Sequence, residues 1–313
     1  MITRNPIAMP SLICLGEPMV EFNQTRPDEP NWLQGFGGDT SNAAIAAARQ
    51  GASVGYLTAL GEDPFGDLFI DLWRREGVDC SRVQRRSDGH TGAVFVTHDA
   101  RGHHFSFMRK GSASSRFSAG DLPRDYLAAA DMLQLSGISQ AISDVARDAC
   151  FAAIDVMKAA GKRVAYDTNL RLRLWPVEAA RDVMHAAMTR VDIALPSLDD
   201  ARAMTGLDDP DAIADFYLRL GPSIVALKMG KDGALVATPE QRHRLAGHQV
   251  KAIDATGAGD TFDGAFLTRL LAGDSPFDAA RYANAAAALS TTGYGAVAPI
   301  PTRRMVESFL AGC

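Results

Sequence analysis

Apolar residues in the second half of the chain follow two alternating periods. Short apolar runs such as 131–137, 163–169 and 191–197 predict buried strands. Between them, 144–161 and 177–190 repeat apolar positions every third or fourth residue, which predicts helices. Strands that alternate with helices of about 10 to 15 residues are typical of a mostly parallel sheet covered by helices on both faces. The pattern therefore predicts an α/β fold.

The first half of the chain begins in the same way. Segment 11–22 predicts a first buried strand and then a turn at Gly16, and segment 53–63 predicts a second buried strand. Segment 37–51, GGDTSNAAIAAARQG, predicts a helix that starts at Ser41 and Asn42 as capping residues and ends at its last glycine.

Two segments, 22–36 and 89–112, interrupt this alternation. They carry β-type residues without an intervening helix, and 93–98 and 103–108 flank the turn sequence DARG at 99–102. We interpret the two segments as a small antiparallel sheet appended to the main sheet. No internal repeat or low-complexity segment is apparent.

Composition excludes several classes of protein. The net charge is −5 and no block of basic residues occurs, which argues against a broad nucleic-acid-binding surface. No apolar run reaches membrane-spanning length, and the N-terminal apolar run is too short for a signal peptide. The cysteines are far apart and form no C-x-x-C pair: Cys14, Cys80, Cys150 and Cys313. A reducing, cytoplasmic location is therefore expected.

The stretch DATGAGDTFDGAF at 254–266 carries the candidate chemistry. A Gly/Ala turn precedes a helical pattern, so Thr256 to Asp260 would lie at a helix N-terminus, where free N–H groups favour an anion. Gly257 and Gly259 would let the backbone approach that anion closely. A carboxylate at Asp260 would repel that anion, so its presence needs a reason. One such reason is that it accepts a proton from a hydroxyl that attacks a phosphoryl group. A first-turn acid that only complements the helix dipole is the alternative for Asp260.

Two other nucleotide-binding classes lack their motifs here. A nicotinamide dehydrogenase needs G-x-G-x-x-G after its first strand, but the first turn reads LGEPMVEF. A P-loop kinase needs G-x-x-x-x-G-K-[ST], which does not occur.

Three stretches together resemble the ribokinase-like (PfkB) carbohydrate kinases. They are 254–266, 37–51 and GEDPFGDLFIDLWRREGVD at 61–79, and the resemblance extends from about Gly16 to about Ala296. It implies a ribokinase-like three-layer fold, with a mostly parallel central sheet, helices on both faces and a small β-sheet lid. By the same resemblance, residues 1–313 would form a single domain, with the two segments of the appended sheet as its lid. It also implies ATP and Mg²⁺ as cofactors, and a homodimer that forms through the lid.

The same resemblance assigns site residues. Asp260 would be the catalytic base, and Gly257, Ala258 and Gly259 the anion hole. Substrate contacts would come from Gly37, Gly38 and Asn42. Nucleotide contacts would come from Lys228, Gly230, Gly233, Asp254, Thr256, Gly257, Gly259 and Asn284. Many relatives also bind a monovalent cation such as K⁺ near residues 254 and 290–296.

Two further segments point to the substrate. FSFMRKGSASS at 105–115 and DTNLRLRLW at 167–175 resemble segments of 2-keto-3-deoxygluconate kinases. By that resemblance Phe107, Arg109, Asn169 and Arg171 would contact the substrate, and the two arginines would hold its carboxylate through their planar guanidinium groups. The second segment also occurs in fructokinases, so a neutral sugar such as fructose or ribose stays open.

The chain departs from this pattern at several positions. Phe107 and Val94 stand where relatives have Tyr or another aromatic residue, which removes candidate hydrogen bonds to the substrate. Ser197 and Asp200 replace the family's N-x-x-E, and Asp200 is a candidate Mg²⁺ ligand through water. A non-catalytic sugar-binding protein on the same fold is a further alternative, although it would be expected to lose Asp260.

Overall fold

The computed structural model describes residues 9–27, 29–99 and 102–312. Segment 1–8, which was considered for a signal peptide, and Cys313 lie outside the described residues, as does the centre of the predicted turn at 99–102. Among the described cysteines, Cys14 and Cys150 are buried, Cys80 is half-buried, and all three are free thiols.

Nine strands of the described chain form the main sheet. Their order across the sheet is β15 (Arg242–Leu245), β14 (Ala234–Ala237), β13 (Ile224–Lys228), β12 (Ile193–Ala194), β11 (Arg163–Asp167), β10 (Met132–Ser136), β1 (Leu12–Leu15), β4 (Val54–Leu57) and β6 (Val78–Asp79). Neighbouring strands from β13 to β6 are parallel, and β14 and β15 are antiparallel additions at one edge. The predicted mostly parallel sheet is therefore confirmed.

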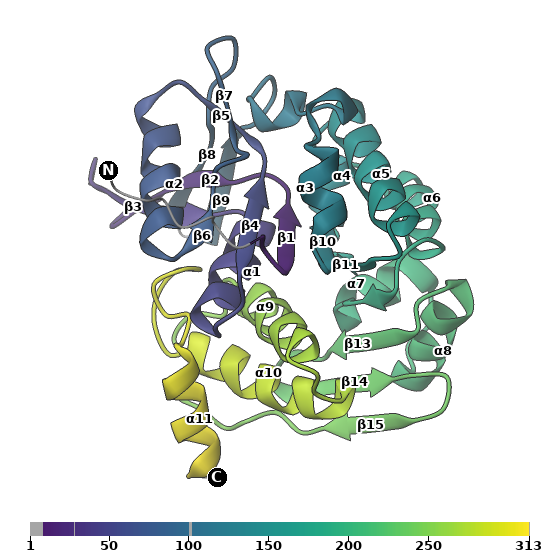
Figure 1. The fold of residues 1–313 in the computed structure, drawn as a ribbon. Helices are drawn as coiled ribbons and strands as arrows, with labels where there is room; N and C mark the ends of the chain where they lie inside the picture. Colours follow the sequence, from purple (N-terminus) through teal and green to yellow (C-terminus); the bar gives the residue numbers. More distant parts are fainter. Residues whose placement is uncertain (1–8, 28, 100–101, 313) are drawn as a thin grey trace, which may run out of the picture.

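Helices cover both faces of this sheet (Figure 1). One face carries α1 (Asp39–Arg49), α2 (Pro64–Arg75), α9 (Ala258–Leu271), α10 (Pro276–Ser290) and α11 (Arg303–Ala311). The other carries α3 (Arg124–Ala129), α4 (Gly137–Ala141), α5 (Asp144–Ala159), α6 (Val177–Met188), α7 (Leu198–Thr205) and α8 (Pro210–Leu220). Three short 3₁₀ turns lie at Ser114–Arg116, Ala119–Asp121 and Gly230–Asp232. No helix among the described residues is both long and apolar enough to cross a membrane.

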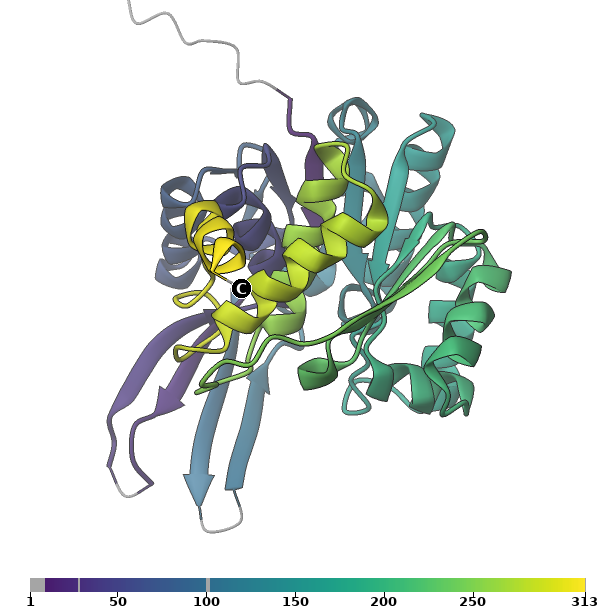
Figure 2. The same cartoon turned by 90° about the horizontal axis from the view of Figure 1, so that it is seen from below.

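A separate four-stranded sheet, called the small sheet below, projects from the body of the molecule (Figure 2). Its strands are β3 (Trp32–Gly37), β2 (Met19–Gln24), β8 (Gly92–Asp99) and β9 (Gly102–Met108), in that order. The prediction of an antiparallel sheet was wrong in one respect. Each hairpin is antiparallel, but the two hairpins join through β2 and β8, which are parallel because the chain crosses the body between them.

Each of the two strand segments predicted in the first half contains two consecutive strands that belong to different sheets. Segment 11–22 divides into β1, in the main sheet, and β2, in the small sheet. Segment 53–63 divides into β4 and β5 (Ala59–Gly61), and β5 pairs instead with β7 (Gln84–Arg86). At Gly16, where the chain leaves β1, a Cβ atom would lie 2.2 Å from Oγ1 of Thr40, so the crossing requires glycine. The turn at Gly16 was predicted, but the apolar residues on either side of it did not reveal that the chain changes sheet there.

Helix α1 begins three residues earlier than predicted, and the assignment of Ser41 and Asn42 as caps was wrong. Gly38 is the N-cap residue, with φ 110°, and no side chain caps the helix. Ser41 and Asn42 lie within the first turns and are buried, so their polar groups bind other elements. Ser41 Oγ accepts a hydrogen bond from the indole of Trp73 at 2.9 Å.

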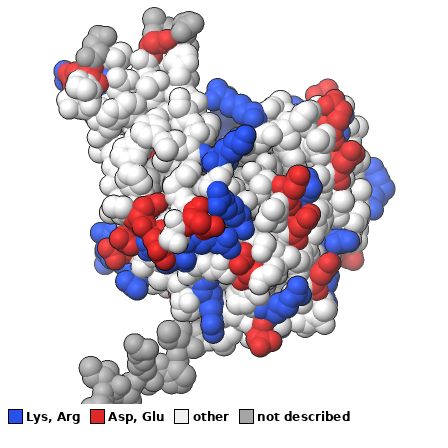
Figure 3. All heavy atoms as spheres, turned by 90° about the horizontal axis from the view of Figure 1, so that it is seen from above, with Lys and Arg blue, Asp and Glu red and all other residues white. Residues whose placement is uncertain are grey.

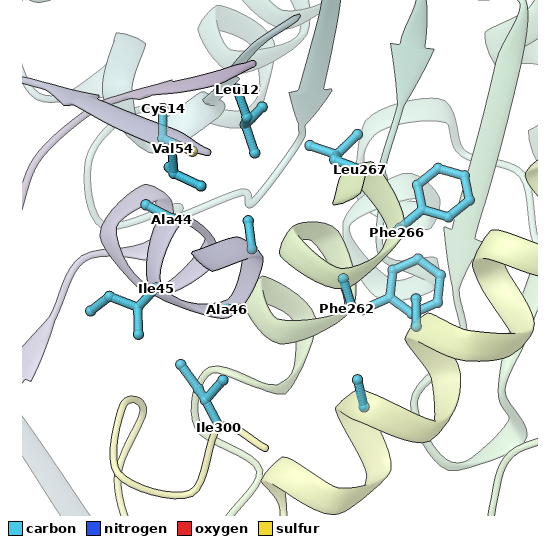
Figure 4. Packing of buried hydrophobic residues seen from close by; sticks show 14 of the residues in the cluster. Leu12, Cys14, Ala44, Ile45, Ala46, Val54, Phe262, Phe266, Leu267 and Ile300 are labelled. Carbon is cyan, nitrogen blue, oxygen red and sulfur yellow. The ribbon is translucent and has the colours of Figure 1, made fainter. Parts of the chain in front are cut away.

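Helices α1 and α9 pack unusually closely, and this contact positions the site. The small side chain of Ala46 in α1 faces Gly264 of α9, whereas Ala44 points toward Cys14 and Val54 of the sheet (Figure 4). From α9, the side chains of Phe262, Phe266 and Leu267 spread toward the sheet and α10. A Cβ atom on Gly264 of α9 would lie only 2.3 Å from the carbonyl oxygen of Ala43. The two backbones can therefore approach each other only because α9 has glycine at this point.

Replacing Gly264 by alanine should destabilise the protein and reduce its activity. The added methyl group meets backbone atoms, which must move, so we expect a loss of about 1–3 kcal/mol in the free energy of unfolding. Urea denaturation measures this loss. Gly120→Ala is the matched control, because its nearest neighbour is an ordinary contact at 3.6 Å. Equal stability of the two variants would contradict the close-packing argument.

Candidate active site

The predicted site residues meet at the carboxyl edge of the main sheet. The chain leaves β1 at Glu17, β11 at Asn169 and β13 at Lys228, and the N-termini of α1 and α9 face the same edge. This is the edge where parallel α/β sheets bind ligands.

The N-terminus of α9 has the geometry predicted for residues 257–260. Gly257 is the N-cap residue in the left-handed conformation, with φ 76°, and a Cβ there would lie 2.9 Å from the carbonyl oxygen of Ala296. The N–H of Ala258 donates to the carbonyl of Ala255 at 3.2 Å. Gly259 stands in the first turn, where N–H groups have no acceptor within the helix. The turn therefore presents donors and a positive helix end toward the site.

Asp260 lies in the first turn of α9 and is half-buried. Its Oδ2 accepts a hydrogen bond at 2.8 Å from the amide Nδ2 of Asn42 in α1, 218 residues away in the sequence. Burial raises the pKa of Asp260 to about 7, and the negative charge of Asp39 is the second cause of this rise. The hydrogen bond from Asn42 acts in the opposite direction. A carboxylate with this proton affinity can accept a proton near neutral pH.

The loop that leads into α9 is held by Asp254. Its Oδ1 accepts hydrogen bonds from the N–H and the hydroxyl of Thr256, at 2.9 and 2.6 Å. Its Oδ2 accepts from the N–H of Gly295 at 2.9 Å. Asp254 thus ties the loop before α9 to the loop after α10, and the predicted loop-ordering role of Asp254 and Thr256 matches this geometry.

Lys228 lies inside a buried ion triad. Its ammonium is 2.9 and 3.0 Å from the two carboxylate oxygens of Asp263 and 3.1 Å from Oδ1 of Asp167. Burial alone would lower the pKa of Lys228, but the two carboxylates raise it above its ordinary value. The ammonium therefore stays charged and lies beneath the first turn of α9, where a Cβ on Gly259 would be 3.7 Å from it.

The turn after β11 is joined to α1. The side-chain amide of Asn169 donates to Oδ2 of Asp39 at 2.9 Å, and the backbone N–H of Asn169 donates to Oδ1 of Asp167 at 3.2 Å. Asn169 has φ 33°, a left-handed conformation that non-glycine residues seldom adopt. Two acidic side chains thus hold this strained turn in place.

Asp200 supports the same turn from α7. Its Oδ2 accepts hydrogen bonds from the N–H of Leu170 at 3.0 Å and from the hydroxyl of Thr168 at 3.4 Å. Burial raises the pKa of Asp200. Among the described residues, no group of three or more His, Cys, Asp and Glu side chains is arranged to hold a metal ion. This does not exclude Mg²⁺, which commonly uses one or two carboxylates together with substrate phosphates and water.

Arg109 joins the small sheet to the body. Its Nε donates to Oε2 of Glu17 at 2.5 Å, and its guanidinium lies 5.0 Å from the ring centre of Phe107. The Glu17 side chain is completely buried, and its Oε1 has no hydrogen-bond partner among the described residues. Burial raises the pKa of Glu17 to about 7, although Arg109 opposes this.

Two arginines, Arg171 and Arg173, lie in the connection between β11 and α6. Arg171 is exposed, and its Nη1 donates to its neighbour's carbonyl, that of Leu170, at 2.9 Å. The Arg173 guanidinium lies 5.6 Å from the ring centre of Phe105, in β9 of the small sheet. The connection that carries Arg171 therefore touches the small sheet across the site.

The remaining predicted residues shape backbone turns. Gly37 ends β3, and a Cβ on Gly38 would lie 2.5 Å from the carbonyl oxygen of Glu17. Gly230 and Gly233 flank the 3₁₀ turn after β13, with φ 59° and 94°. Asn284 is buried in α10 and donates to the carbonyl of Ala246 at 2.7 Å.

Sequence reasoning missed four acidic residues at this site: Glu17, Asp39, Asp167 and Asp263. Each lies within or beside one of the sequence motifs quoted above. Asp263 follows Asp260 by three residues, so both lie on one side of α9. That spacing, and the acid directly after two glycines at 37–38, were signals that could have been used.

The face of the molecule drawn in Figure 3 carries charges of both signs. Figure 3 shows Lys and Arg side chains interspersed with Asp and Glu over the visible face, without a broad area of one sign.

Known proteins resemble this chain over most of its length. It is 34% identical to 2-dehydro-3-deoxygluconokinase of Bacillus subtilis (strain 168), with 89% of this chain and 87% of that protein covered. It is 33% identical to 2-dehydro-3-deoxygluconokinase of Thermoproteus tenax, with 97% and 95% covered. It is also 30% identical to fructokinase-2 of Solanum habrochaites, with 96% of each covered. 2-Dehydro-3-deoxygluconate and 2-keto-3-deoxygluconate are the same compound.

Solved structures share the fold. A PfkB protein from Polaromonas sp. JS666 is 31% identical, with a TM-score of 0.87 and 96% of this chain and 99% of that chain covered. Fructokinase from Vibrio cholerae O395, in a form with bound fructose, ADP and calcium, is 29% identical, with a TM-score of 0.86 and 96% and 99% covered. The predicted ribokinase-like fold is thereby confirmed.

The model of the pfkB family carbohydrate kinases matches residues 9–303, nearly the whole chain. Together with the relatives and the site geometry, this match establishes that the chain belongs to the pfkB family of carbohydrate kinases.

Proposed function

We propose that this chain phosphorylates 2-keto-3-deoxygluconate at its primary hydroxyl with ATP, and that Asp260 is the general base. The observation that carries the proposal is the position of Asp260 in the first turn of α9, hydrogen-bonded to Asn42 and adjacent to free helix donors. The two 2-dehydro-3-deoxygluconokinase relatives support the substrate.

The proposed reaction is in-line phosphoryl transfer. Asn42 donates to Oδ2 of Asp260, which leaves Oδ1 to accept the proton of the attacking hydroxyl. The N–H groups of Gly257 and Gly259 would stabilise negative charge on the transferred group, and that of Ala258 would join them once it leaves the carbonyl of Ala255. Lys228 would add positive charge beneath this turn, while Asp167 and Asp263 keep it fixed. Mg²⁺, when bound, would neutralise the phosphate oxygens, with Asp200 as a ligand through water.

The nucleotide would lie along the loops that follow β13 and α10. We assign Gly230, Gly233 and Asn284 to its neighbourhood, and Asp254 and Thr256 to ordering the loop beside its phosphates. A monovalent cation such as K⁺ near Asp254 and residues 290–296 belongs to the same proposal. Gly37 and Gly38 would let the backbone of α1 approach the sugar.

Arg109 and Arg171 are proposed to hold the substrate carboxylate, with Phe107 and Asn169 beside them. Arg109 is paired with Glu17, so an incoming carboxylate must compete with this ion pair. Both the ion pair and the fructokinase relative favour a second candidate, a neutral sugar of the fructose type. In that case Arg109 would only join the small sheet to the body.

The small sheet is proposed to act as a lid over the sugar and as a dimer interface. The lid would exclude water, which could otherwise attack ATP. Apolar side chains on one face of the sheet are exposed, with Leu33 at 65% and Phe105 and Phe107 each at 45%. Such a patch is typical of a surface that is covered by a second subunit.

Asp260→Asn should retain ATP binding and lower kcat by about a thousandfold, the usual contribution of a general base. The wild-type kcat/KM should fall below about pH 7, because the raised pKa leaves Asp260 protonated and unable to accept a proton there. An ADP-release assay over a pH series measures both effects. Asp278→Asn, in the first turn of α10, is the control that removes an equivalent charge. Near-normal turnover of Asp260→Asn would rule out the base assignment.

The substrate assignment is tested by comparing 2-keto-3-deoxygluconate, its galacto epimer, gluconate, fructose and ribose in the same assay. We expect preference for the ketodeoxy acids, and Arg109→Ala should raise KM for them at least about tenfold more than for fructose, since a charge-assisted pair is lost. Lys110→Ala, its exposed neighbour, is the charge control. Preference for fructose, with equal losses on both substrates, would favour the second candidate.

Leu33→Asp should dissociate a dimer formed through the small sheet, because it places a charge within the apolar patch. Sedimentation velocity at several concentrations measures the assembly state. A monomeric wild-type protein, or a Leu33→Asp variant that remains dimeric, would contradict this interface.

A further inference from the structure

Asp39 is a buried carboxylate at the site that the proposed mechanism does not use. It is the first residue of α1, with 8% of its surface exposed. Its Oδ1 has no hydrogen-bond partner among the described residues, although the Ser136 hydroxyl and the Thr40 N–H lie close enough to the carboxyl group to oppose the rise in pKa that burial causes. A buried carboxylate oxygen without a partner is costly, so its retention indicates a role beyond starting the helix.

Asp39 contacts the turn that carries two of the proposed substrate contacts. Its Oδ2 accepts the amide of Asn169 at 2.9 Å. Asn169 has a left-handed backbone, which persists only where the surroundings hold it. The Asp39 carboxylate is one of the groups that hold it, and Arg171 lies two residues further along the same turn.

Asp39 is also linked to the proposed base through α1. Asn42, three residues later and thus on the same side of α1, donates to Asp260 at 2.8 Å. The charged groups that face Asp260 are Asp39 from α1, Asp167 from β11 and Lys228 from β13. Asp39 itself faces Asp167 of β11, Arg171 after β11 and Glu17 after β1. The single ammonium of Lys228 is already shared by Asp167 and Asp263, which leaves Asp39 and Asp260 without a direct cationic partner of their own in the described structure.

We propose that Asp39 is a positioning residue for phosphoryl transfer, which fixes the Asn169 turn with one oxygen and places its negative charge beside Asp260. This inference rests on the proposed role of Asp260 as base. Two neighbouring carboxylates disfavour each other's ionisation, so Asp39 increases the proton affinity of the base. After burial, Asp39 is the largest cause that raises the pKa of Asp260. A base with higher proton affinity takes the substrate proton more readily near neutral pH.

Asp39→Asn separates the charge of this residue from its hydrogen bond. The amide oxygen can still accept the Asn169 amide, but the negative charge is gone. The acid limb of the kcat/KM profile should therefore move to lower pH by about half a unit to one unit, as expected when a nearby like charge is removed. At pH 5.5 the variant should keep a larger fraction of its own maximal rate than the wild type does.

Asp39→Ala removes both functions. We expect the same displacement of the acid limb, together with a severalfold higher KM because the Asn169 turn is no longer held. Asn169→Gly removes only the contact and tolerates the positive φ, so it should raise KM while leaving the acid limb in place. ATP binding and the thermal unfolding midpoint show whether each variant is folded.

An unchanged acid limb in Asp39→Asn would overturn the proposal, since only the charge is altered there. Asp278→Asn should leave the limb unchanged, and a shift in this control as well would overturn it too, because the effect would then follow from overall charge. Failure of the proposed function has a different signature. In that case Asp260→Asn would remain active, whatever the Asp39 variants do.

Discussion

The site depends on the close approach of α1 and α9. Gly264 lets the backbone of α9 lie against that of α1, and this contact brings Asn42 to Asp260 across 218 residues of sequence. The two helices start at the same edge of the sheet, so their positive ends face one volume. If the helices lay a methyl group further apart, the Asn42–Asp260 hydrogen bond would lengthen by more than such a bond tolerates.

The pKa values at the site follow from the burial of several acidic side chains around few cations. Asp39, Asp167, Asp260 and Asp263 converge from three elements, and Lys228 is the cation that contacts two of them. Burial makes each negative charge costly, and it raises the pKa of Asp39, Asp260 and Asp263, in the last case although Lys228 is in contact. Asp260 is left as the acid with an accessible oxygen and raised proton affinity. The same burial that is unfavourable for stability thus suits proton transfer.

The small sheet adds a second set of constraints. Its connection to the body passes through Gly16 and Gly38, where neighbouring chains leave no room for a side chain. Arg109 and Glu17 join the two parts at this crossing, and Arg173 contacts Phe105 on the far side of the site. Movement of the small sheet would therefore change the surroundings of Arg109, Phe107 and Arg171 together.

The sequence by itself determined the local features of this protein. Helical and strand periods, the left-handed turn at Gly257 and the position of Asp260 in the first turn of α9 all depend on residues close together in the chain. Only the tertiary structure decided which partner each polar group has. It placed Lys228 between Asp167 and Asp263, joined Asn169 to Asp39, and sent β2 into a second sheet. Local spacing predicts which face a side chain occupies, but burial and long-range contact set its partner and its proton affinity, and these arise only when distant segments pack.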